Sequence, residues 1–110
     1  MRRIHIDPYA KGTRTRWFKQ NIRTEWPYVV DWTSVVAARS GVTAVSSVEW
    51  KSVGSRDATI TGKDLTSDVA SALIASLWGG YTQVRCEATF DDGNTMSVYI
   101  DITFEDPEYR

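Results

Sequence analysis

The clearest pattern in the sequence is an alternation of apolar and polar residues over residues 83–104. Alternate positions on either side of one polar turn are apolar: Val84, Cys86, Ala88 and Phe90, then Met96, Val98, Ile100, Ile102 and Phe104. The turn, DDGN, places Gly93 where a hairpin loop needs a positive φ. Such period-2 patterning predicts an antiparallel hairpin with one face on a core and one face in water.

Shorter β-rich segments precede this hairpin, at residues 27–32, 43–52 and 54–64, each bounded by Gly, Pro or polar residues. Strict alternation in the second segment puts Val45 and Trp50 on opposite faces, and we expect Trp50 to point inward. About seven short strands, with turns every eight to twelve residues or so, favour an all-β fold in which two antiparallel sheets form a sandwich.

Two segments fit more than one structure. Residues 33–41, TSVVAARSG, suit a helical turn that Thr33 or Ser34 caps and Gly41 ends, or a bent strand. The segment DLTSDVASALIASLW carries apolar residues near helical spacing, with Asp64 as a candidate cap, but it also suits a strand. The residue pattern leaves both alternatives open.

The length and the charge distribution predict one domain with an extended N-terminal arm. A chain of 110 residues fits a single modest core. Residues 1–27 hold seven Lys or Arg against two acidic residues, a charge of +5, whereas residues 28–110 hold six against twelve, a charge of −6. The first segment also lacks a sustained period. We therefore expect a basic arm over residues 1–27 and a sandwich over residues 28–110.

The arm carries the candidate partner-binding residues. Its aromatic residues are too many for a solvated tail, and Trp and Arg dominate many protein interfaces. We predict that the arm of one copy lies along the acidic surface of a neighbouring subunit, through Arg14, Arg16, Trp17, Phe18, Lys19 and Trp26. The same interleaving of basic and aromatic residues is compatible with phosphate contacts and base stacking, but seven charges over 27 residues do not specify nucleic acid, which we regard as the weaker interpretation.

Candidate catalytic and metal-binding chemistry is sparse. Cys86 is the single cysteine and His5 the single histidine, so neither a disulfide within the chain nor a cysteine-based metal cluster is available. Gly62 and Lys63 lack the other residues of a phosphate-binding loop, and the aspartates form no dense calcium loop. We predict a protein that is not an enzyme and has no cofactor.

No stretch approaches the roughly 20 apolar residues that cross a bilayer, so we expect synthesis in the cytoplasm of the host and no membrane partner.

Several short motifs, in order, resemble a family of small immunoglobulin-like β-sandwich proteins of tailed bacteriophages, described as fibre-tail adaptor proteins. They are Asp31-Trp32 in an early strand, Trp50 at the end of the next, the Gly79-Gly80 pair before a strand, and Asp92-Gly93 at the last hairpin. The resemblance covers about residues 28–104 and implies that residues 69–78 form a strand. The long basic arm departs from the family pattern. Trp78 departs from it as well, because a small polar residue is usual at this position.

The resemblance implies a structural protein of the virion. Such a protein acts as an adaptor or decoration subunit that attaches fibre, tail or neck components or covers the capsid surface. Its partners are other phage structural proteins and copies of itself, as a homo-oligomer within a symmetric particle. The alternative is a small binding module that recognises a protein or a glycan through its loops.

Overall fold

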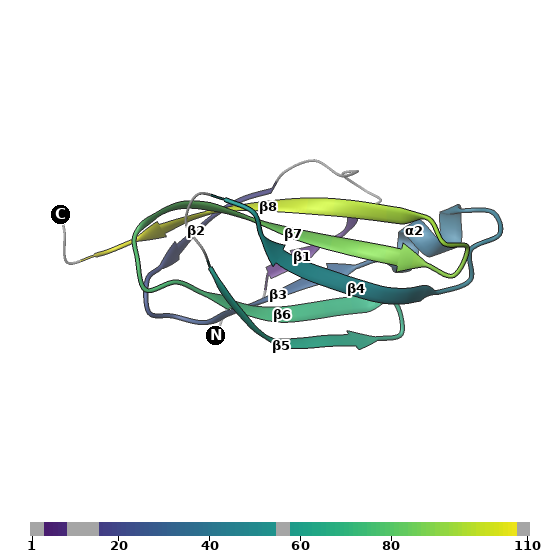
Figure 1. Cartoon of the computed structure of the whole chain (residues 1–110), viewed down its shortest axis with the longest axis horizontal. Coiled ribbons are helices and arrows are strands. Elements are labelled where there is room, and N and C mark those ends of the chain that lie inside the picture. The colour runs from purple at the N-terminus through teal and green to yellow at the C-terminus, as the bar shows by residue number, and fades with distance from the viewer. Residues whose placement is uncertain (1–3, 9–15, 55–57, 108–110) are drawn as a thin grey trace.

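Two four-stranded β-sheets face each other across one hydrophobic core (Figure 1). The computed structural model describes residues 4–8, 16–54 and 58–107 of the 110-residue chain. Sheet A has the strand order β1 (Ile4–Ile6), β3 (Trp26–Asp31), β6 (Val69–Ala75) and β5 (Thr59–Thr66). Sheet B has the order β2 (Arg16–Asn21), β8 (Thr95–Glu105), β7 (Gly80–Phe90) and β4 (Val45–Ser52). The predicted all-β class is confirmed.

The hairpin of β7 and β8 is the longest paired unit and forms the centre of sheet B. The two strands pair from Gly80 opposite Phe104 to Thr89 opposite Thr95. Every predicted inward residue of the hairpin is buried except Met96, which is half-buried. Gly93 has a φ of 87°, as the turn requires. The alternation in the sequence therefore gave the correct faces of both strands.

Aromatic residues from both halves of the chain meet in the core. Trp32 and Phe90 are fully buried and pack edge to face, with ring centroids 6.0 Å apart. Tyr28 of β3 and Trp50 of β4 are also buried. The inward orientation predicted for Trp50 is confirmed.

Val45 and Trp50 both point into the core, although strict alternation places them on opposite faces. The register of β4 against β7 shifts between Val45, opposite Phe90, and Ser47, opposite Thr89. Ser46 is the extra residue of this β-bulge. An extra residue turns every later side chain of the strand to the opposite face of the sheet. Strict alternation of the two faces was therefore the wrong assumption for β4.

The structure resolves the two segments that the residue pattern left open. Residues Thr33–Ala38 form a short helix, α2, and Gly41 follows it with a φ of 81°. Trp32 occupies the N-cap position, so neither Thr33 nor Ser34 is the cap. Residues Val69–Ala75 form β6, with alternate residues buried, which agrees with the strand that the family resemblance implied. Its pairing on both sides, with β3 and β5, outweighs its helical spacing.

The described residues of the N-terminal segment do not form an arm, contrary to the prediction. Ile4 and Ile6 of β1 are buried, and β2 pairs along its whole length with β8. Ile22, also buried, continues this pairing by donating its N–H to the carbonyl of Glu105 at 3.0 Å. The boundary expected after residue 27 falls inside β3. These strands are too short for a period of two to stand out, because β1 has three residues and β2 has six.

The sheets are mixed, so the prediction of an antiparallel sandwich is wrong for two of its pairs. Strand β1 runs parallel to β3, and β2 runs parallel to β8. Parallel neighbours need long connections, and the connection from β2 to β8 contains all the elements from β3 to β7. In the described part of the chain, no helix has the length and apolar character to cross a membrane.

Candidate functional site

Large apolar side chains that stay exposed gather at one end of the molecule. Among the described residues they are Trp17, Val53, Leu77, Trp78 and Tyr81, here called the aromatic patch. Trp78 and Leu77 are the most exposed, at 67% and 64%, and Trp17 follows at 61%. Single exposed apolar residues are ordinary on a protein surface, whereas a shared location of this kind is typical of interaction sites.

The chain brings these residues together through the start of β7. Leu77 and Trp78 lie in the β6–β7 loop, and Tyr81 follows the two glycines. Gly80 has a φ of 127°, which L side chains rarely adopt. Val53 joins from the end of β4, because its N–H donates to the carbonyl of Gln83 at 2.7 Å.

The β6–β7 loop is held at its base by Ser76. The Ser76 hydroxyl donates to the carbonyl of Trp78 at 2.9 Å, and it accepts from the Trp78 N–H at 3.1 Å. The Ser76 carbonyl accepts the N–H of Arg23 at 2.8 Å. Ser76 itself is buried, so the exposed Leu77 and Trp78 project from a fixed base.

Trp17 and Tyr81 form a stacked pair on the outer face of sheet B. Their ring centroids are 5.3 Å apart and their planes differ by 13°. Trp17 lies on β2 opposite Asp101 of β8, and Tyr81 lies on β7 opposite Thr103. The two rings therefore come from strands on either side of β8 and meet over it.

Asp101 accepts hydrogen bonds from two β7 side chains on the outer face of sheet B, those of Tyr81 and Gln83. The Tyr81 hydroxyl donates to Asp101 Oδ1, and Gln83 Nε2 donates to the same oxygen at 3.1 Å. Although Asp101 stands on the outward side of β8, only 3% of it is exposed. The hydrogen bond to Asp101, with smaller effects of burial and of the carboxylate charge, raises the pKa of the Tyr81 phenol.

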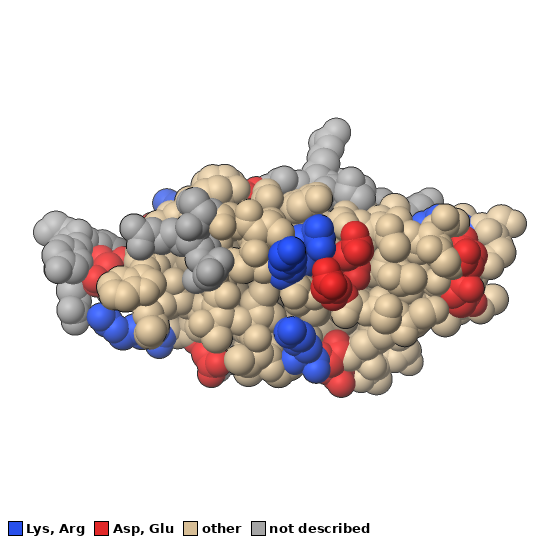
Figure 2. Space-filling view, in the orientation of Figure 1, with Lys and Arg blue, Asp and Glu red and all other residues tan. Residues whose placement is uncertain are grey.

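The charged residues around this face carry both signs. Lys19 Nζ lies 3.8 Å from Glu105 Oε1, and Arg85 donates to Glu49 Oε1 at 2.9 Å. Basic and acidic residues are also interspersed over the face shown in Figure 2.

The structure separates the predicted partner-binding residues. Trp17 and Lys19 are exposed on the outer face of sheet B. Phe18 points the other way and packs edge to face on Tyr28, with centroids 5.8 Å apart. Trp26 is also partly buried against the core. Arg16 begins β2, and Arg14 lies outside the described residues.

Four members of the aromatic patch were not among the predicted binding residues. For Trp78, its departure from the family pattern was the one signal that marked it. For Tyr81, the residue pattern gives no sign that its hydroxyl donates to the Asp101 side chain. Nothing in the local sequence indicates that Val53 or Leu77 stays exposed.

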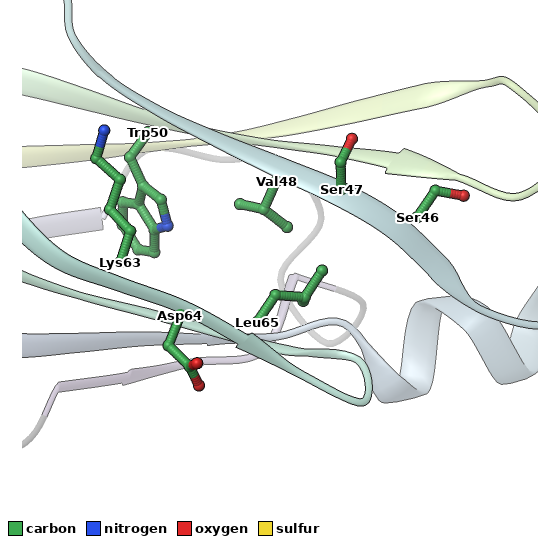
Figure 3. Close-up of a pocket in the computed structure, with 7 residues that line it drawn as sticks. All are labelled: Ser46, Ser47, Val48, Trp50, Lys63, Asp64 and Leu65. Atoms are coloured by element: carbon green, nitrogen blue, oxygen red, sulfur yellow. The ribbon is translucent and has the colours of Figure 1, made fainter.

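A lateral groove opens between the edge strands β4 and β5 (Figure 3). Val48 and Leu65 face each other across it, and the buried Trp50 also lines it, beside Lys63. The cavity measures about 330 Å³ and is completed by Ser46, Ser47, Lys63 and Asp64. These side chains offer apolar contact and hydrogen bonds, without a histidine or cysteine among them.

Cys86 is inaccessible as a nucleophile. It is fully buried in β7, and burial raises the pKa of its thiol to about 12. His5 is exposed on β1. Within residues 4–8, 16–54 and 58–107, no three His, Cys, Asp or Glu side chains gather in a way that could hold a metal ion.

No protein-family model matches the chain, and no curated protein matches it. Solved structures do resemble it. The cysteine protease inhibitor EhICP2 from Entamoeba histolytica aligns over 94% of this chain and 95% of its own, with a TM-score of 0.51 and 9% identity. PbICP-C, solved in complex with falcipain-2, aligns over 96% of this chain and 100% of its own, with a TM-score of 0.54 and 10% identity. At these identities, the likeness is one of fold over nearly the whole chain.

Proposed function

We propose that this chain is a non-catalytic docking module of immunoglobulin-like fold, and that it serves as an adaptor or decoration subunit in the virion of a tailed bacteriophage. One observation carries the docking role: the exposed large apolar side chains of the described residues share one end of the molecule. Two tryptophans and one tyrosine are among them. These residue types dominate the binding energy of many protein interfaces.

Ring stacking and hydrogen bonds hold three residues of the aromatic patch in place. Trp17 and Tyr81 lie on the two strands that pair with β8 and stack on each other, and the Tyr81 hydroxyl donates to Asp101. Trp78 is held through Ser76. A preorganised surface loses little conformational entropy on binding, which favours affinity for a fixed neighbour.

The phage assignment rests on the motifs of the sequence. Asp31-Trp32, Trp50, the double glycine and Asp92-Gly93 occur in the order of the fibre-tail adaptor family. In this proposal, the aromatic patch, in place of the predicted arm, attaches the chain to other phage structural proteins and to copies of itself. Trp17 is a binding residue both in the predicted arm and in the aromatic patch. Phe18 and Trp26 are not part of the proposed binding surface, because they pack against the core.

The test is incorporation into particles of the phage that encodes the chain. A Trp17→Ala, Trp78→Ala double variant should fold but be depleted from purified virions by at least about tenfold, as expected when two interface anchors are lost. Thr95→Ala, exposed at the β7–β8 turn, is the matched control and should be incorporated normally. Normal incorporation of the double variant would refute docking through the patch.

Inhibition of a cysteine protease is a second candidate, favoured by one observation. Two structures that match nearly the whole fold are the inhibitor EhICP2 and a protein bound to falcipain-2. The assay is hydrolysis of a peptide substrate by a papain-type protease in the presence of the purified chain. Dose-dependent inhibition that survives the Trp17→Ala, Trp78→Ala double change would replace the adaptor proposal, and absence of inhibition would remove this candidate.

A further inference from the structure

The carboxyl group of Asp101 is buried, and the side chains that donate hydrogen bonds to it are neutral. Tyr81 and Gln83 donate to it through a hydroxyl and an amide, and 3% of the residue is exposed. Among the side chains that the structure describes, no cation forms an ion pair with it. A buried carboxylate is stabilised much better by a cation than by neutral donors alone.

The basic side chains of β2 and β7, the two strands that flank Asp101's strand, have acidic partners of their own, and Lys51 lies one strand farther away on β4. Arg85 lies two residues along β7 from Gln83, the residue opposite Asp101, and its guanidinium pairs with Glu49 at 2.9 Å. Lys19, two residues along β2 from Trp17, pairs with Glu105 at 3.8 Å. The negative charge of Asp101 thus remains beneath the stack of Trp17 and Tyr81.

The stack itself also favours a cation. The faces of aromatic rings carry negative potential, which is strongest for Trp, and cations bind over them. A phenol that donates a hydrogen bond to a carboxylate gains electron density in its ring, so Asp101 strengthens the negative potential over Tyr81. The indole of Trp17 is 61% exposed and is the accessible surface of this pair.

We propose that the partner docks an arginine side chain on the Trp17–Tyr81 stack, with its guanidinium over the exposed indole and above Asp101. This inference rests on the proposed docking function and names the chemistry of the partner at the patch. Arginine fits better than lysine because a planar, weakly hydrated guanidinium stacks on an aromatic face. Apolar contacts from Leu77 and Trp78 would surround the charged contact and exclude water, as at other interface centres.

The experiment titrates the full chain with the capped tripeptide acetyl-Gly-Arg-Gly-amide, followed through the Trp17 indole N–H signal in NMR spectra. The matched probe carries citrulline, which has nearly the same shape without the charge. We expect saturable shifts with the arginine probe and binding about two- to fivefold weaker with the citrulline probe, the range of an exposed cation–π contact. In Trp17→Ala, followed through the backbone amide signals of β2 and β7, the difference between the probes should be lost.

Asp101→Asn separates the charge from the shape of the site. Asparagine still accepts a hydrogen bond from the Tyr81 hydroxyl, so the stack is retained, while the preference for arginine over citrulline should shrink. Equal binding of the two probes to the unaltered chain, or no saturable shift with either, would overturn the arginine proposal. Loss of virion incorporation in Trp17→Ala would in that case still support docking through the patch by other chemistry, so the two proposals fail separately.

Discussion

The hydroxyl of Tyr28 donates a hydrogen bond to Gln20 Oε1 at 2.8 Å and so joins the two sheets through the core. Tyr28 lies on β3 of sheet A, and Gln20 lies on β2 of sheet B. Gln20 is 1% exposed, and its amide nitrogen donates to the carbonyls of Ile74 and Thr24, at 2.8 and 2.9 Å. A single buried side chain therefore satisfies polar groups from three parts of the fold.

The first prediction concerns this bridge. Gln20→Leu should lower the free energy of unfolding by about 1 to 3 kcal/mol, because it leaves a buried hydroxyl and a buried carbonyl without a partner. Urea denaturation measures the change. Adding Tyr28→Phe removes the orphaned hydroxyl and should recover part of the loss. Lys19→Gln, at the exposed neighbouring position, is the control, and equal midpoints for Gln20→Leu and the control would contradict the bridge.

The second prediction concerns the N-terminal strands. Deleting residues 2–25 should abolish the cooperative thermal transition, because it removes β1 and β2 and uncovers the edge of β8. If this segment were an arm outside the core, the truncated chain would melt cooperatively. The point variant Trp17→Ala keeps the strand and changes an exposed residue, so its transition should stay close to that of the unaltered chain.

The third prediction follows from the raised pKa of Tyr81. The neutral phenol is the hydrogen-bond donor, so the stability it contributes is fully present below its ordinary pKa of about 10 and is lost as the pH rises through the higher folded value. The melting temperature of the chain should therefore exceed that of Tyr81→Phe at neutral pH, and the gap should close in strong alkali. Asp101→Asn should bring the phenolate transition of Tyr81, followed by absorbance, back toward the ordinary pKa.

The fourth prediction concerns the buried thiol. At mildly alkaline pH, Cys86 should not react with a thiol-specific disulfide reagent in the folded chain, since the thiol is buried and its pKa is about 12. Reaction should be rapid once guanidinium chloride unfolds the protein. A native labelling rate equal to the denatured rate would show that the thiol is accessible.

The long hairpin was predictable because its partners are neighbours in the chain and its alternation is unbroken. Strand β2 was not, although its residues do alternate: Trp17 and Lys19 point outward, and Phe18 and Gln20 point inward. The inward Gln20 looks like a surface residue in the sequence, because the Tyr28 hydroxyl and the Ile74 carbonyl that satisfy it come from distant segments. The partner strand β8 lies near the other end of the chain, beyond the reach of any local pattern.

The aromatic patch was only partly predictable for a related reason. Trp17 and Trp78 have the same intrinsic preference for burial as Trp32 and Trp50, and composition does not distinguish the two pairs. The difference lies in position. Trp32 and Trp50 face the opposite sheet, whereas Trp78 projects from a loop and Trp17 lies on the outer face of sheet B.

The parallel pairing of β2 with β8 bears on how the protein folds during synthesis. Among the strands of sheet B, β2 leaves the ribosome first and β8 leaves last, yet β8 is the strand that β2 needs. At the usual elongation rates of about 5 to 20 residues per second, β2 waits for several seconds. Throughout that delay Phe18 and Ile22 have no β8 to cover them, which makes the nascent N-terminal segment a natural binding site for chaperones.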